Sequence, residues 1–140
     1  MTGGIPVRVG DVMTGSIRKI GRTATAADAI EAMREAGVSS LVVERRDDTD
    51  EFGLVTITDI AREVTSKDRP ADRVNVYEVM SKPVLTLPVD MRTEYAVRLL
   101  VRFQLSRALV VDHSRLPVGI VTLRDMVLRH HADGQRTRHP

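Results

Sequence analysis

Apolar residues recur at helical spacing in the first third of the chain. Ala29 and Met33 belong to one apolar stripe, and Gly37 follows it as a stop signal. Before the stripe, Thr25 and Asp28 have the spacing of a capping box, in which a hydroxyl and a carboxylate cap the first helical turn. The pattern predicts a short helix that begins after Thr25 and ends before Gly37.

Uninterrupted apolar runs predict strands on both sides of this helix. Residues 41–43 and 54–57 fit an antiparallel hairpin, and residues 17–20 fit an earlier strand that pairs in parallel with 41–43 through a right-handed crossover. A second helix follows the hairpin, with Thr58 or Asp59 as its expected cap. The predicted order of elements is therefore β-α-β-β-α.

The chain carries this pattern twice. Val7–Thr14 returns 67 positions later as Val74–Ser81, and Gly53–Asp59 returns 66 positions later as Gly119–Asp125. A constant offset that slips by one residue indicates an internal duplication with a single deletion in a loop. The sequence thus predicts one repeat at 7–64, a linker at 65–73, a second repeat at 74–130 and a flexible tail at 131–140. The second repeat is expected to hold strands at 84–87, 108–111 and 119–123 and helices at 93–104 and 125–130. Arg92 stands where Thr25 caps the first helix, so Asp90 or Thr93 is the expected cap of the helix at 93–104.

One helix differs between the repeats. Where the first repeat has a mixed surface at Ala32, Arg34 and Ala36, the second has apolar side chains at 99, 101 and 103. A helix that is apolar nearly all round is buried on more than one side. Either it meets a second copy of the chain in a homodimer, or it packs more tightly against the sister repeat.

Composition excludes several classes of protein. The 140 residues include 42% hydrophobic residues and no cysteine, so one folded domain without disulfides or thiolate zinc sites is expected. No signal segment or membrane-spanning run is evident, which predicts a soluble cytoplasmic protein without a membrane partner. Nor does any nucleophile set, paired histidine, phosphate loop or dinucleotide motif occur, so we expect neither an enzyme nor a required cofactor or metal.

Charge is concentrated locally. The isoelectric point of 9.4 invites a nucleic-acid partner, but without the three Arg and one Asp of 129–140 the chain has 18 basic and 18 acidic residues. With only two Phe, two Tyr and no Trp, a basic stripe with interleaved aromatics is missing, so no nucleic-acid partner is expected. Residues 12–60 carry six basic and nine acidic side chains, whereas 79–126 carry seven and four. The positive second repeat is consistent either with charge drift or with a phosphate site.

The repeated segments Gly53–Asp59 and Gly119–Asp125, here called the landmarks, each have a Thr and, three residues later, an Asp where a strand is expected to pass into a helix. A helix N-terminus presents free N–H groups, a Thr hydroxyl can donate to a phosphate oxygen, and an Asp carboxylate can accept both hydroxyls of a ribose. The alternative is that these residues only cap the helix.

Several motifs together resemble a tandem pair of CBS domains, a Bateman module. They are the Val-Met-Thr/Ser openings, the segments at 37–43 and 105–112, and both Gly-x-x-Thr-x-x-Asp landmarks. The resemblance implies an α/β (α+β) fold in which two repeats pack sheet to sheet with pseudo-two-fold symmetry. It also implies two clefts, each formed by strand-start residues of one repeat and the Thr-x-x-Asp end of the other, with adenine nucleotides as the usual ligands.

The resemblance assigns residues to each cleft. The first would hold the base, ribose and phosphate with Ile17, Arg18, Val38, Ser39, Ser40, Arg107, Thr122, Arg124 and Asp125. The second would use Thr56, Thr58, Asp59, Val84, Leu85, Leu105 and Ser106. Because Ser40 stands in the second cleft where Arg107 stands in the first, the cleft with Asp125 is expected to bind anionic nucleotides more tightly.

The resulting expectation is a stand-alone regulatory module that senses AMP, ADP or ATP as effector and signals to an unknown regulated protein through rearrangement of a homodimer. The alternatives are a ligand-free dimeric interaction scaffold and a binder of another adenosyl ligand, such as NAD or S-adenosylmethionine.

Overall fold

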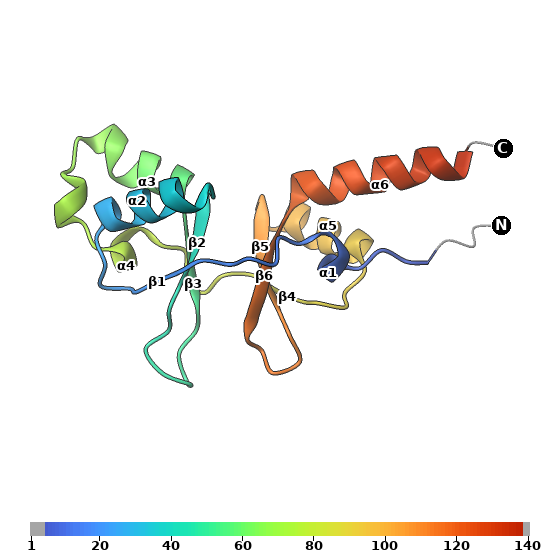
Figure 1. Ribbon diagram of the computed structural model, residues 1–140, viewed down its shortest axis with the longest axis horizontal. Helices are drawn as coiled ribbons and strands as arrows, with labels where there is room; N and C mark the ends of the chain where they lie inside the picture. The colour runs from blue at the N-terminus through green and yellow to red at the C-terminus, as the bar shows by residue number, and fades with distance from the viewer. Residues whose placement is uncertain (1–4, 139–140) are drawn as a thin grey trace. The chain divides into compact units, whose positions relative to one another are not determined.

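The computed structural model describes residues 5–138, which form two compact units (Figure 1). One unit consists of residues 18–84, and the other combines residues up to 17 with residues from 85 onward. Each unit contains a three-stranded sheet with helices, so the mixed α/β class is confirmed. The elements are α1 (Val9–Val12), β1 (Lys19–Ile20), α2 (Ala26–Ala36), β2 (Ser40–Val43), β3 (Gly53–Thr56), α3 (Ile57–Glu63), the 3-10 turns η1 (Thr65–Lys67) and η2 (Ala71–Arg73), α4 (Val76–Val79), β4 (Thr86–Pro88), α5 (Thr93–Arg102), β5 (Arg107–Val111), β6 (Pro117–Thr122) and α6 (Leu123–Arg138).

The first unit has the predicted β-α-β-β-α order in β1-α2-β2-β3-α3. β1 pairs in parallel with β2, and β2 pairs antiparallel with β3 in the register Ser40 to Thr56. Thr25 and Asp28 form the predicted capping box of α2, and Gly37 ends the helix in the left-handed conformation with φ of 66°. The predicted start and end of this helix are therefore confirmed.

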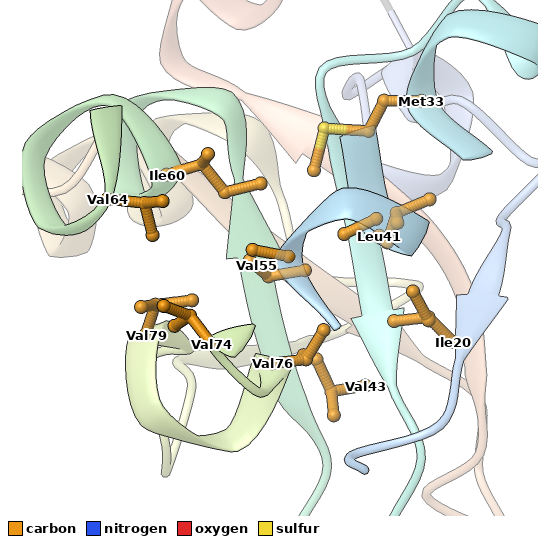
Figure 2. Packing of buried hydrophobic residues seen from close by; sticks show 12 residues of the cluster. Ile20, Met33, Leu41, Val43, Val55, Ile60, Val64, Val74, Val76 and Val79 are labelled. Carbon is orange, nitrogen blue, oxygen red and sulfur yellow. The ribbon is translucent and has the colours of Figure 1, made fainter. Parts of the chain in front are cut away.

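The core of this unit lies between its sheet and its helices. Leu41 and Val43 point from β2 toward the same cluster that Met33 enters from α2 and Ile60 from α3 (Figure 2). Leu41 and Val43 are fully buried. Because side chains alternate along a strand, Val42 points away from this cluster, and it is fully buried as well. Both faces of β2 are therefore covered, which explains its unbroken apolar run.

The second unit repeats the topology with β4-α5-β5-β6-α6. β4 pairs in parallel with β5, and β5 pairs antiparallel with β6 in the register Arg107 to Thr122. Leu87, Leu100 and Met126 form its core with the other buried residues of the cluster. The repeated order of elements follows from the internal duplication.

The two repeats of the sequence exchange their N-terminal segments. α1 precedes the first sheet in the chain, yet Val9 is buried in the core of the second unit, and Thr14 forms an antiparallel bridge with Ile120 of β6. In the same way, α4 precedes the second sheet, yet Val76 is buried in the first core. Each repeat, as defined by sequence, therefore completes the core of the other one.

The landmark glycines serve this exchange. A Cβ atom at Gly119 would lie 2.5 Å from the Met13 sulfur and 2.8 Å from the Thr14 carbonyl oxygen. A Cβ atom at Gly53 would lie 2.8 Å from the Met80 sulfur. These separations are shorter than van der Waals contact, so only glycine lets the exchanged segment pack against the strand. The two duplicated landmarks thus fit each other across repeats.

An ion pair anchors the exchanged segment of the first unit. Lys82 Nζ lies 2.7 Å from the carboxylate of Asp50, whose side chain is nearly buried in the β2–β3 loop. The Lys82 ammonium holds the pKa of Asp50 well below its ordinary value, and the Arg46 backbone N–H, which donates to the same carboxylate, acts in the same direction. The β2–β3 loop is therefore held to the segment that follows α4.

Two helix boundaries differ from those expected. No side chain caps α5, whose N-cap residue is Arg92, so neither Asp90 nor Thr93 replaces the missing cap. α6 continues to Arg138, whereas the sequence predicted a helix end near His130 and a tail beyond it. The polar extension lacks an apolar stripe. An Arg129–Asp133 ion pair at i,i+4 spacing and the absence of proline between Leu123 and Arg138 favour a continued helix.

Candidate functional site

Each unit gathers its landmark residues at one end of its sheet. In the first unit Ser40 is the register partner of Thr56, and the Ser39 carbonyl accepts from the Ile57 N–H at 2.9 Å. In the second unit Arg107 is the partner of Thr122, and the Ser106 carbonyl accepts from the Leu123 N–H at 2.8 Å. The start of the central strand and the Thr-x-x-Asp motif of one repeat therefore lie beside each other.

The other predicted residues divide between the units. Arg18, Val38, Thr58 and Val84 belong to the unit of residues 18–84, and Ile17, Leu85, Leu105 and Arg124 belong to the other. Both predicted clefts draw on both units, so their assembly stays a prediction.

In the first repeat the landmark is a complete capping box. The Asp59 N–H donates to Thr56 Oγ1 at 3.1 Å, and the Thr56 N–H donates to Asp59 Oδ2 at 2.9 Å. Thr56 is the N-cap of α3, so the expected cap at Thr58 or Asp59 is wrong. The reason is spacing, because the hydroxyl of a capping box reaches the N–H three residues ahead.

Arg62 takes the remaining oxygen of Asp59. Its Nη2 atom donates to Oδ1 at 2.8 Å from one helical turn further along. The Asp59 side chain is only 9% exposed, and each of its oxygens has a partner within its own helix turn. This carboxylate is committed to the fold of α3.

In the second repeat the corresponding carboxylate is open. The Asp125 N–H donates to Thr122 Oγ1 at 3.1 Å, which is half of a capping box. Among the described residues, no backbone N–H donates to the Asp125 carboxylate, and its one side-chain partner is Arg124, with Nη1 3.4 Å from Oδ1. The Asp125 side chain is 42% exposed, against 9% for Asp59. The two duplicated aspartates therefore have different structural roles.

The difference comes from a residue that the motif does not include. Three residues after Asp59 stands Arg62, and three residues after Asp125 stands Leu128, which cannot donate a hydrogen bond. Side chains at i and i+3 lie on the same face of a helix, so Arg62 can donate to Asp59, whereas Leu128 offers Asp125 no such donor. The spacing was visible in the sequence, but Arg62 lies outside the repeated landmark.

Chemistry at this end of the second sheet suits an anionic sugar ligand. The Thr122 hydroxyl and the Asp125 carboxylate lie at the start of α6, and Arg124 adds a guanidinium that is 79% exposed. Within residues 5–138, no three His, Asp or Glu side chains are grouped to hold a metal ion. None of the helices over these residues is both long and apolar enough to span a bilayer.

Comparison with known proteins identifies the family. The CBS domain family matches residues 9–66 and 76–131. The chain belongs to the CBS domain family. The resemblance read from the Val-Met-Thr/Ser and Gly-x-x-Thr-x-x-Asp motifs is thereby confirmed.

Curated proteins and solved structures are similar to this chain. An uncharacterized protein of Methanopyrus kandleri, MK0525, is 35% identical over 117 residues, which cover 84% of this chain and 57% of the relative. The chain spans about half the length of the curated relatives it matches. The hexameric CBS-CP12 protein from bloom-forming cyanobacteria is 31% identical, with a TM-score of 0.86 over 91% of this chain and 74% of that one. The CBS domain pair of protein MJ0100, solved with 5′-methylthioadenosine and S-adenosyl-L-methionine, shares the fold at 20% identity and a TM-score of 0.76, over 91% of this chain and 98% of that one.

Proposed function

We propose that this CBS pair is a regulatory module that binds an adenosyl ligand, with AMP, ADP or ATP as the leading candidates. The observation that carries the proposal is the open Asp125 carboxylate at the start of α6, beside the Thr122 hydroxyl. A ribose diol offers two donors to such a carboxylate. The adenosyl ligands of the MJ0100 CBS pair support the same ligand class.

The proposed site takes one set of residues from each repeat. Ile17, Arg18 and the segment Val38–Ser40 would surround the adenine, and Asp125 would accept from the ribose. Thr122, Arg124 and Arg107 would face the phosphates, where a planar guanidinium can donate two parallel hydrogen bonds. Three cationic or hydroxyl groups on the phosphate side favour a nucleotide over an uncharged nucleoside.

Regulation would follow from the two-repeat site. A ligand that contacts both repeats can favour one arrangement of them only by the difference in its affinity for the two arrangements. The number of phosphates facing Arg107 and Arg124 is a physical source of such a difference. The module would then report the ratio of nucleotides to the protein that it regulates.

Thermal unfolding in the presence of ligands tests the proposal. A ligand at about 100 times its dissociation constant adds roughly 2.7 kcal/mol to the free energy of unfolding. We expect millimolar ATP, ADP or AMP to raise Tm by several degrees in differential scanning fluorimetry, with guanosine nucleotides as the control. NAD and S-adenosylmethionine are included to separate the adenosyl alternatives. An unchanged Tm with every one of these compounds would contradict ligand sensing and favour the interaction scaffold.

An apolar surface on the second unit supports self-association. Val101 and Phe103 at the end of α5 are 61% and 56% exposed, and Val127 and Leu128 on the adjacent α6 are about half exposed. On the first unit the equivalent position of Val101 is Arg34, which is exposed and paired with Glu31. We infer that the α5 and α6 surface pairs with the same surface of a second copy in a homodimer.

Phe103→Asp should dissociate this dimer. The substitution replaces an exposed apolar side chain by a charge, while the exposed position leaves the core of the monomer intact. Light scattering at micromolar concentration should give the mass of a dimer for the parent and of a monomer for the variant. Arg34→Asp, on the matching helix of the first unit, is the control and should stay dimeric. A dimer that persists in Phe103→Asp would refute the interface.

A further inference from the structure

The side chain three residues after each landmark aspartate controls whether that carboxylate is available to a ligand. Arg62 donates to Asp59 at 2.8 Å, whereas Leu128 leaves Asp125 without an equivalent donor. Both aspartates occupy the third position of their helix, and the N–H of each donates to the hydroxyl oxygen of the Thr three residues before it. Two contacts differ. The Thr56 N–H donates to the Asp59 carboxylate, whereas no backbone N–H of the described residues donates to that of Asp125, and the i+3 side chain is a donor only in the first repeat.

We propose that Leu128 is the positioning residue that keeps Asp125 open, and that the chain consequently has one working nucleotide site, at Asp125, and one structural aspartate, at Asp59. The inference rests on the proposed function. It adds a determinant that lies outside the Thr-x-x-Asp motif and acts through the carboxylate.

The physical argument is competition for carboxylate oxygens. The Asp59 carboxylate accepts from the Thr56 N–H through one oxygen and from the Arg62 guanidinium through the other. These strong, charge-assisted hydrogen bonds take the place of hydrogen bonds to water. A ribose would have to displace the guanidinium before it could bind both oxygens, and the burial of Asp59 closes off the approach further. Asp125 is 42% exposed and binds only the flexible, exposed Arg124 at 3.4 Å. It can therefore exchange partners at low cost.

Leu128→Arg tests the inference, because it reproduces at Asp125 the i+3 pair of the first repeat. Val127→Arg is the matched control, since Val127 and Leu128 are 50% and 51% exposed on the same surface. The two variants add the same charge next to the same helix turn, but an i+2 side chain does not face Asp125. Any effect on the proposed dimer surface or on the local field is therefore shared by both variants.

The probes are ATP and adenosine, titrated into the full chain by isothermal calorimetry. If the overall electrostatic attraction between the protein and the phosphates controlled affinity, an added arginine would strengthen ATP binding. We expect the opposite for Leu128→Arg, with affinity at least about tenfold lower for both ATP and adenosine, because the ribose acceptor is occupied. Val127→Arg should bind adenosine as the parent does. Leu128→Met, which keeps an apolar side chain without a donor, should bind both probes with the affinity of the parent. The parent itself should bind one ATP per chain.

The outcomes separate this inference from the proposed function. Parental binding of adenosine by Leu128→Arg, equal losses in Leu128→Arg and Val127→Arg, or two ATP molecules bound per parental chain would each overturn the inference while leaving nucleotide binding in place. A parent that binds neither probe would overturn the proposed function and this inference with it.

Discussion

Asp125→Ala should weaken nucleotide binding by roughly 10- to 100-fold. The substitution removes the acceptor for the ribose, and loss of about 1.5–3 kcal/mol, as for a hydrogen bond to a charged group, corresponds to a change of this size in Kd. The Asp125 side chain is 42% exposed and caps no backbone N–H with its carboxylate, so its removal should leave the fold of α6 nearly intact. Calorimetric titration with ATP measures the loss, and the Tm of the free protein checks the fold.

Asp59→Ala is the matched control and should behave in the reverse way. Its carboxylate accepts from the Thr56 N–H and from Arg62, so the variant should lose about 1–2 kcal/mol of unfolding free energy. Its ATP affinity should stay within about twofold of the parent if the working site is at Asp125. Equal losses of affinity in the two alanine variants would contradict the ranking of the two aspartates.

Val9→Asp should unfold the second unit although Val9 belongs to the first repeat of the sequence. Val9 is fully buried in the cluster that contains Leu87, Leu100 and Met126. An uncompensated buried carboxylate costs roughly 3–5 kcal/mol, which is a large part of the stability of a small domain. Hydrogen exchange should therefore show lost protection in β4, β5 and β6 before β1, β2 and β3.

Val9→Ala is the milder form of the same test, for the case in which the aspartate variant unfolds altogether. Loss of two buried methyl groups removes about 2 kcal/mol, which corresponds to roughly 30-fold faster exchange of amides that open with this unit. Val76→Ala, equally buried in the first core, should speed exchange in β1, β2 and β3 instead. If Val9→Ala affected the first sheet more than the second, the exchange of segments would be wrong.

Local signals in the sequence predicted the elements well because each depends on neighbouring residues. The Thr25 and Asp28 box, the Gly37 stop and the unbroken apolar run of β2 act over one helical turn or one strand. The same logic applied to Thr56 and Asp59 would have found the true cap of α3, since their spacing equals that of Thr25 and Asp28.

The site was predicted in part. The sequence ranked Asp125 above Asp59 on the contrast between Arg107 and Ser40, and that ranking stays a prediction. The structure supplies a second contrast, between Arg62 and Leu128, that bears on the same two carboxylates. The repeated motif does not reveal it, because residues 62 and 128 are equivalent positions outside the motif and differ between the repeats.

By itself the sequence determined the CBS family, the duplication and the order of elements in each repeat. These follow from periodicity and from motif spacing, which are properties of short stretches of chain. Only the tertiary structure decided which sheet receives the segments around Val9 and Val76, and which aspartate keeps an open carboxylate. An apolar stripe records that a segment must be buried but does not name the surface that buries it. Likewise, whether a carboxylate is open to a ligand depends on the hydrogen-bond donors that the folded chain places next to it.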